Sequence, residues 1–239
     1  MSLVAEHNPF TGRIGEEYGY LAMMCPNVVT LTRRLGEYVR DWNSGAPMRG
    51  LEIGCGTGLS TLSLLSHRDN LRLLAFDSSP AMLKQARENL APYAERVDFV
   101  EGDALAVLKQ QPDASADVIA SNYTIHNFLG DYREQVFAEV LRVLKPGGLF
   151  ANGDRFAMDD RAAHLAWTQG EVRHWFKSFA EIKRLDLLED WIAHLLSDES
   201  PHHIMVLAPT LATMQRLGFA NVRVEYREGV DALVAATKL

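Results

Sequence analysis

Short apolar runs alternate with amphipathic stretches from Arg49 onward, and this alternation restricts the fold more than any other feature of the sequence. The apolar runs have the length of strands, and the stretches between them have helical spacing. Strand, helix and strand repeated in this order are typical of a parallel sheet with helices on both faces, an α/β fold. The expected strands are residues 50–53, 71–76, 97–100, 117–121 and 148–152.

Several helix ends can be read from capping residues. Ser79-Pro80 is typical of an N-cap followed by proline in the first turn, and the periodic run 132–144 stops at a Lys-Pro-Gly-Gly segment. Another helix ends at Gly218, before two further apolar runs at 222–226 and 232–236. Because the segment between these runs is too short for a parallel crossover, the last strand should be antiparallel.

Two segments lie outside the alternation in what we expect to be one domain, residues 1–239. Residues 1–45 form an N-terminal helical cap with an expected helix at 28–42, and residues 156–206 form a helical insertion after the fifth strand. The insertion can serve as extra core, as a lid over the substrate or as the surface of a homodimer. Its apolar positions have the spacing of a broad buried stripe: Phe176, Phe179, Ile182, Leu185, Leu188, Trp191, Ile192 and Leu195.

Composition excludes several classes of function. The chain has 24 Lys and Arg against 31 Asp and Glu, a net charge of -7, without a basic cluster, so nucleic acid is not an expected partner. Cys25 and Cys55 are too few for a disulfide framework and fit a reducing compartment. Neither a membrane-spanning run nor a signal-peptide pattern is visible, so we expect a cytoplasmic protein that does not enter membranes.

A glycine turn is the most informative motif. The segment Glu52-Ile53-Gly54-Cys55-Gly56-Thr57-Gly58 follows an expected strand and opens a helix. Glycines at such a turn let the backbone approach a ligand closely. Enzymes that bind dinucleotides place a third glycine five positions after the first, and here Leu59 occupies that position. A pyrophosphate site for NAD is therefore disfavoured.

Three carboxylates characterise the expected ligand. Asp77 ends the second strand, where it can accept both ribose hydroxyls of a nucleoside, and Asp103 ends the third, where it can accept from an adenine amine. Glu52 precedes the turn, which has no basic residue. A ligand that meets these groups should carry positive charge and hydroxyls without phosphate. S-adenosylmethionine fits this description, whereas NAD and ATP do not.

The sequence resembles class I S-adenosylmethionine-dependent methyltransferases in five ordered motifs. Residues 52–58 are similar to the family's first motif, Asp77 to its ribose-binding acid and Asp103-Ala104 to its adenine contact; residues 117–127 and 144–149 resemble its later motifs. The resemblance implies a doubly wound seven-stranded sheet in the order 3-2-1-4-5-7-6. It also implies a cofactor site lined by Gly54, Gly56, Asp77, Ser78, Asp103, Ala104 and Asn122, to which we add Glu52, Cys55 and Tyr20.

Four segments also resemble carboxy-S-adenosylmethionine synthases, which make a carboxylated cofactor for transfer RNA modification. They are residues 76–82, 100–103, 121–124 and 153–156. Two departures are visible. The arginine that in this family holds the new carboxylate falls near Leu195, where this sequence has no arginine, although Arg173 or Arg184 could replace it. The family's cofactor-contacting tyrosine falls near residues 25–29, where only Tyr18 and Tyr20 are close. Without a partner for a buried carboxylate such an enzyme would be severely impaired, so we favour ordinary methyl transfer.

The chemistry of methyl transfer requires alignment of the acceptor and, for a nucleophile that carries a proton, a base. His126 follows the fourth strand and could act as this base; the alternative is a supporting or helix-capping histidine. Asp154 could orient or deprotonate the acceptor, and Arg155 and Tyr123 could bind it, the alternative being an ion pair that ties down the insertion.

Tyrosines near the N-terminus and a histidine pair are further candidates for a role in the site. Tyr18 and Tyr20 could close over the methionine end of the cofactor or simply pack, and His202-His203 is typical of a surface pair, so no metal is expected. The sequence therefore predicts a methyltransferase that uses S-adenosylmethionine on a small molecule. The alternatives are a synthase-like enzyme that acts on the cofactor and a non-catalytic S-adenosylmethionine-binding protein.

Overall fold

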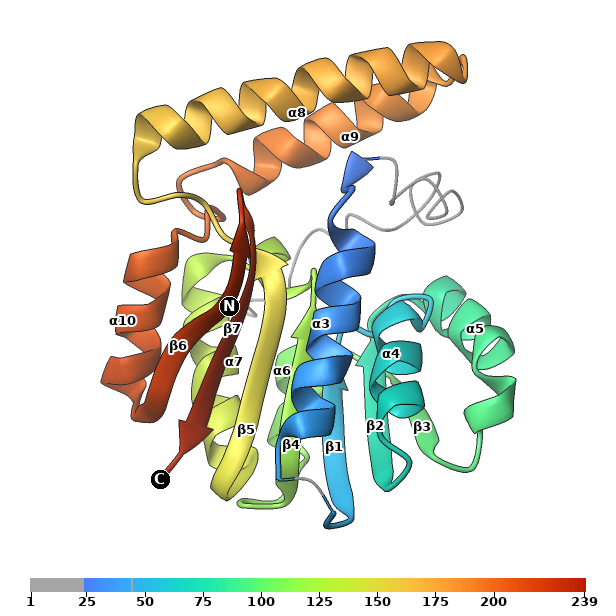
Figure 1. Ribbon diagram of the computed structural model, residues 1–239, viewed down its shortest axis with the longest axis vertical. Coiled ribbons are helices and arrows are strands. Elements are labelled where there is room, and N and C mark those ends of the chain that lie inside the picture. Colours follow the sequence, from blue (N-terminus) through green and yellow to red (C-terminus); the bar gives the residue numbers. More distant parts are fainter. Residues whose placement is uncertain (1–23, 44) are drawn as a thin grey trace.

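The computed structural model describes residues 24–43 and 45–239, which form a seven-stranded sheet in the order β3-β2-β1-β4-β5-β7-β6 (Figure 1). This is the expected order. β7 is antiparallel to both its neighbours, β5 and β6, and the other pairs are parallel. The strands are β1 (Met48–Ile53), β2 (Leu71–Asp77), β3 (Val97–Glu101), β4 (Ala116–Asn122), β5 (Leu144–Arg155), β6 (Phe219–Glu228) and β7 (Asp231–Lys238).

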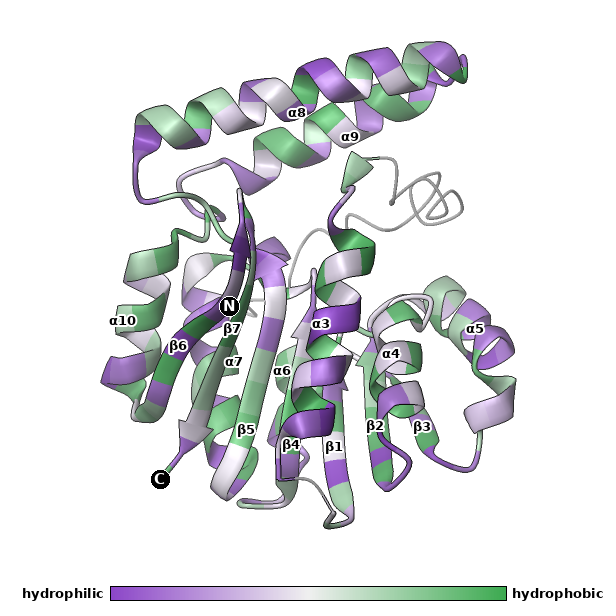
Figure 2. Ribbon diagram, viewed as in Figure 1, coloured by the Kyte–Doolittle hydropathy of each residue, from purple (hydrophilic) through white to green (hydrophobic). Residues whose placement is uncertain are grey.

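Helices cover both faces of the sheet, as the strand and helix alternation predicts (Figure 1). One face packs against α3 (Val28–Asp41), α4 (Leu59–His67) and α5 (Pro80–Asn89), and the other against α6 (Ala104–Lys109), α7 (Gly130–Val143) and α10 (Leu207–Leu217). Two short 3-10 helices, η2 (Ala91–Tyr93) and η3 (Ile125–Asn127), complete these layers. The sheet is therefore buried on both sides, and in Figure 2 its central strands are largely hydrophobic.

The capping residues act as the sequence indicates. The Ser79 side chain accepts a hydrogen bond from the Met82 amide and Pro80 is the first residue of α5. Gly218 ends α10 with a φ of 110°, in the left-handed region. The expected helix at 28–42 ends one residue early, and β6 and β7 extend beyond the expected runs because their antiparallel ladder continues to the turn.

The insertion is a helical hairpin, α8 (Arg161–Glu181) and α9 (Leu185–Asp198), that lies across the ends of the central strands (Figure 1). Phe179 and Trp191 belong to the same hydrophobic core as α3 and α4. The expectation that Phe176 and Leu185 share this buried stripe is wrong: their side chains are 52% and 57% exposed. No helix in the described part of the chain is long and apolar enough to cross a bilayer.

Candidate active site

The glycine turn joins the end of β1 to the start of α4. Gly54 and Gly56 have φ angles of 67° and 52°, in the region that favours glycine. A Cβ at Gly54 would lie 2.2 Å from the Thr124 side chain, so only glycine fits without displacement. The Gly54 and Cys55 amides both donate to the Phe76 carbonyl, at 2.8 and 3.1 Å, which fixes the turn beside the end of β2.

Asp77 links this turn to the next helix. Its carboxylate accepts hydrogen bonds from the Gly56 amide and the Ser79 amide, each at 2.9 Å. Burial raises the pKa of Asp77, although the backbone hydrogen bonds act in the opposite direction. Ser78 lies between these bonded positions and is exposed. The structure thus holds a carboxylate rigidly at the place where the sequence predicts the ribose contact.

Glu52 lies beneath the turn rather than on its surface. It is fully buried, and its two oxygens accept hydrogen bonds from Ser60 (2.5 Å) and Thr61 (2.6 Å) in the first turn of α4. Burial raises its pKa to about 7. Cys55 is also buried, which raises the pKa of its thiol. In this geometry Glu52 positions the helix start; its direct contact with a ligand stays a prediction.

Asp103 is held by its own hydrogen bonds at the end of β3. One oxygen accepts from the Ala106 amide at 3.0 Å, which caps α6 just before Ala104, and the other accepts from the Tyr132 hydroxyl at 2.6 Å. The Tyr132 oxygen in turn accepts from the Leu105 amide at 2.9 Å. Tyr132 was not among the predicted site residues, because its place on α7 gives no sign of this contact.

Asn122 ends β4 and has an open hydrogen-bond acceptor. Its side-chain amide donates to Thr32 Oγ1 at 2.8 Å, while its buried Oδ1 has no partner among the described residues. A buried acceptor of this kind fits an ammonium donor such as that of S-adenosylmethionine. Tyr18 and Tyr20, predicted to lie over the same ligand, fall outside the described residues.

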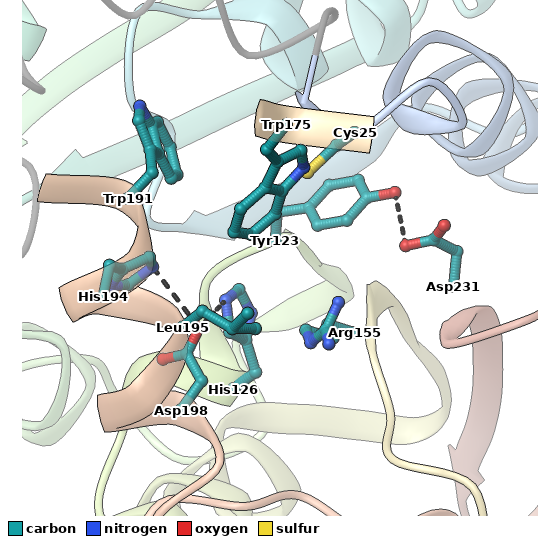
Figure 3. Close-up of a pocket in the computed structure, with 10 residues that line it drawn as sticks. All are labelled: Cys25, Tyr123, His126, Arg155, Trp175, Trp191, His194, Leu195, Asp198 and Asp231. Atoms are coloured by element: carbon teal, nitrogen blue, oxygen red, sulfur yellow. Dashed lines mark hydrogen bonds and ion pairs between the residues drawn. The ribbon is translucent and has the colours of Figure 1, made fainter. Parts of the chain in front are cut away.

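A cavity of about 50 Å³ lies between the sheet edge and the hairpin (Figure 3). Tyr123, His126 and Arg155 reach it from the ends of β4 and β5, and α8 and α9 contribute two tryptophans and polar groups. The residues that line it are Cys25, Tyr123, His126, Arg155, Trp175, Trp191, His194, Leu195, Asp198 and Asp231. Three predicted site residues therefore converge on one cavity.

His126 is oriented by Asp154. Its Nδ1 lies 2.5 Å from an Asp154 oxygen, and the other oxygen of this fully buried carboxylate accepts from the Ile125 and His126 amides. Burial lowers the pKa of His126, but the nearby carboxylates of Asp154 and Asp198 outweigh it and the pKa is raised. Asp154 itself does not line the cavity; it fixes the ring so that Nε2 faces the hairpin.

Arg155 forms the ion pair that was the alternative to substrate binding. Its guanidinium contacts Glu171 through two hydrogen bonds of 2.8 Å and Glu199 through one of 3.1 Å. Burial lowers its pKa, but these two carboxylates reverse the effect and raise it. The pair ties β5 to the hairpin, so a substrate that bound Arg155 would compete with Glu171.

Tyr123, the predicted substrate contact after β4, has a φ of 49° and donates from its hydroxyl to Asp231 at 2.9 Å.

The hairpin contributes cavity residues that were not predicted. His194 and Asp198 lie four residues apart on α9, and their side chains meet at 3.4 Å. A histidine and an aspartate four residues apart lie on one face of a helix, which the sequence already indicates. Their contribution to the cavity can be recognised only in the structure, where α9 lies beside His126.

The sequence of residues 51–152 matches the profile of a family described as a methyltransferase domain. This part of the chain is therefore similar to methyltransferase domains, and the sheet order is that of the class I, S-adenosylmethionine-dependent methyltransferase fold. The chain is 28% identical over 113 residues to carboxy-S-adenosyl-L-methionine synthase from Escherichia coli, which covers 46% of this chain and 44% of the relative. The chain therefore matches less than half the length of that relative.

Solved structures share the fold at low identity. An O-methyltransferase family protein from Burkholderia thailandensis superposes with a TM-score of 0.65 at 16% identity, over 99% of this chain and 65% of the other. The [4+2]-cyclase SpnF superposes with a TM-score of 0.58 at 15% identity, over 86% and 80%. Since one neighbour is named a methyltransferase and the other a cyclase, the reaction must be argued from the site.

Proposed function

We propose that this protein transfers the methyl group of S-adenosylmethionine to a small molecule bound in the cavity between the sheet edge and the hairpin. In such a transfer an acceptor lone pair forms the new bond to carbon while the carbon–sulfur bond breaks. The bonding electrons return to sulfur and give S-adenosylhomocysteine. The protein aligns the two reactants, and an O–H or N–H acceptor must also lose its proton.

The observation that carries the proposal is the position of two consecutive residues at the end of β4. Asn122 has a buried, unpartnered Oδ1 and follows Ser121, which pairs with Ile53 just before the glycine turn, and Tyr123 lines the cavity. A cofactor that contacts Asp77 and Asn122 would therefore end next to the cavity. His126 presents Nε2 to that cavity, where its lone pair can engage the acceptor. Substrate roles for Arg155 and Tyr123 remain part of the prediction.

Calorimetry with S-adenosylmethionine tests the cofactor assignment. We expect binding by the unmodified protein and at least tenfold weaker binding by Asp77→Ala, because each hydrogen bond to a charged group contributes about 1.5–3 kcal/mol. Asp69→Ala, at an exposed aspartate before β2, is the matched control and should bind unchanged. No binding by the unmodified protein would contradict the proposal.

Turnover is measured as S-adenosylhomocysteine released with a panel of small hydroxyl, thiol and amine acceptors. We expect release to depend on the acceptor. Cofactor binding without release across a broad panel would favour the non-catalytic alternative. We also expect a cytoplasmic location and no binding of nucleic acid.

A synthase-like activity is the second candidate, favoured by the similarity to carboxy-S-adenosyl-L-methionine synthase. The cavity wall argues against it. Leu195 is apolar and buried there, Arg155 is already bound by two carboxylates, Arg173 is exposed and Arg184 pairs with Asp186. Mass spectrometry after incubation with S-adenosylmethionine and prephenate distinguishes the two activities. Detection of a cofactor heavier by a carboxylate would show the synthase-like activity and contradict methyl transfer as the function.

The outer face of the hairpin fits either a lid or a dimer surface. Its large apolar side chains Leu165, Phe176, Leu185 and Leu196 are 52–68% exposed. Light scattering distinguishes the roles: a dimeric mass that Leu196→Glu converts to a monomer supports the dimer surface. A monomeric mass for the unmodified protein supports the lid.

A further inference from the structure

Three potential metal ligands meet at the hairpin side of the cavity. Nε2 of His194 lies 3.4 Å and Nε2 of His126 lies 3.9 Å from the same Asp198 oxygen, and all three ligand atoms lie within 4.8 Å of one another. Each side chain is only 10% exposed. Figure 3 shows the three groups converging from α9 and from the end of β4.

The separations are close to those of a loaded site. Ligand atoms about 2.0–2.1 Å from a tetrahedral ion lie about 3.4 Å from one another. The His194–Asp198 separation already has this value, the His126–Asp198 separation exceeds it by 0.5 Å, and the separation between the two histidine ligand atoms is within 4.8 Å. Small side-chain rotations would therefore close the three groups around one ion.

Asp154 prepares His126 to act as a ligand. Because the 2.5 Å contact engages Nδ1, the proton of a neutral ring is placed there and the Nε2 lone pair is directed at Asp198 and His194. Metal-binding histidines usually donate their other ring N–H to a carboxylate or carbonyl in this way, which fixes the ring and increases its basicity. Asp154 is fully buried and held by backbone amides, so this orientation is rigid.

The surrounding charge also favours a cation. Arg155 and Arg133 are the guanidinium groups whose charges act on Asp198 or Asp154. Arg155 is bound by Glu171 and Glu199, so its charge is already compensated. The buried and partly buried carboxylates around the two guanidinium groups are more numerous: Asp154, Glu171, Asp198, Glu199 and Asp231.

We propose that His126, His194 and Asp198 bind one divalent transition-metal ion, such as Zn²⁺ or Fe²⁺, at the wall of the acceptor cavity. Two imidazoles and one carboxylate suit these ions, whereas Mg²⁺ and Ca²⁺ prefer oxygen ligands. Three protein ligands leave at least one coordination position open. The cavity lies on that side, so the open position would take an oxygen or nitrogen donor of the acceptor.

This inference deepens the proposed function and rests on it for the identity of the cavity. An acceptor bound to the ion becomes more acidic, as water does on Zn²⁺. A coordinated Nε2 has no lone pair for a proton, so His126 would then act as a ligand, and the acidified acceptor would lose its proton to solvent water before methyl transfer. The site also departs from the sequence expectation of no metal, which considered only the adjacent pair His202-His203.

Metal binding can be measured without any assay of activity. The untagged protein is stripped with a chelator and titrated with Zn²⁺ against a chromophoric competitor, and with Co²⁺ by visible absorption. We expect one ion per chain and no competition by Mg²⁺. His194→Ala and Asp198→Ala should weaken Zn²⁺ binding at least 100-fold, and Asp154→Asn should weaken it about 10- to 100-fold.

His202→Ala is the matched control, because it removes an exposed histidine outside the cavity and should leave Zn²⁺ affinity unchanged. Circular dichroism checks folding, and His194→Gln replaces His194→Ala if the smaller side chain unfolds the hairpin. Unchanged Zn²⁺ affinity in a folded His194 variant would overturn the proposal, as would less than one site per chain. Binding of S-adenosylmethionine to the stripped protein is measured in parallel, so failure of the metal site and failure of the cofactor assignment are separate results.

Discussion

Glu52 should make the stability of the protein fall as the pH rises toward neutrality. Its carboxyl is fully buried, and burial raises its pKa from the ordinary 4.5 to about 7, against the opposing hydrogen bonds of Ser60 and Thr61. A raised pKa means that the folded protein binds a proton more tightly than the unfolded chain. Stability is therefore greatest below pH 4.5, falls between about pH 4.5 and 7, and is constant above that range for this group.

The size of the effect follows from the shift. At 1.36 kcal/mol for each pKa unit, a shift from 4.5 to about 7 corresponds to about 3 kcal/mol in the free energy of unfolding. Glu52→Gln removes the ionisable group while its amide can still bond to both hydroxyls. The free energy of unfolding of the variant minus that of the unmodified protein should thus increase by about 3 kcal/mol between pH 4.5 and 8.

Urea unfolding at several pH values, followed by both circular dichroism and tryptophan fluorescence, measures this difference. Coincident transitions from the two probes support a two-state treatment. Glu88→Gln, at an exposed position on α5, is the control and should show no such change. A difference that is constant from pH 4.5 to 8 would contradict the raised pKa, because Glu52 would then ionise alike in the folded and unfolded chain.

Three further substitutions test the turn and the hairpin by urea unfolding. Gly54→Ala should cost about 2–4 kcal/mol, since the new Cβ meets a threonine side chain and φ is positive; a cost near zero would contradict the turn geometry. Phe179→Ala should lower the free energy of unfolding by about 3–5 kcal/mol because the ring is fully buried. Phe176, on the same helix, is 52% exposed, so Phe176→Ala should lower it by less than about 1 kcal/mol. Equal losses would show that α8 does not pack through the face that contains Phe179. Glu171→Gln should cost about 2 kcal/mol or more, because Arg155 keeps only one carboxylate partner, and an unchanged midpoint would show that the pair is not formed in solution.

The sheet could be predicted from the sequence because its signals are local. Strand-length apolar runs, the Ser79-Pro80 cap and Gly218 each act within a few residues. The exposed positions Phe176 and Leu185 were mispredicted for the opposite reason. A two-helix hairpin that packs on only one side buries part of each apolar stripe, and helical spacing alone does not tell which part.

The candidate site also contains one part that local sequence motifs predict and one part that depends on contacts between distant segments. The glycine turn and Asp77 are read from a short motif, because both partners lie at neighbouring strand ends. The cavity depends on contacts between distant segments: His126 and Asp198 are far apart in sequence and meet only because α8 and α9 cross the strand ends. Arg155 was assigned to a substrate as an alternative to an ion pair, and nothing local to it reveals that Glu171, on α8, is its partner.

The different origins of the cofactor side and the cavity wall indicate which residues select the acceptor. The residues that face the expected cofactor come from strand ends, whereas one wall of the cavity comes from α8 and α9. The fold is shared with both a named methyltransferase and a named cyclase, so it does not determine the reaction alone. His194 and Asp198 on α9 place a nitrogen and a carboxylate opposite His126. The identity of the acceptor should therefore follow changes in α9 more closely than changes in the cofactor turn.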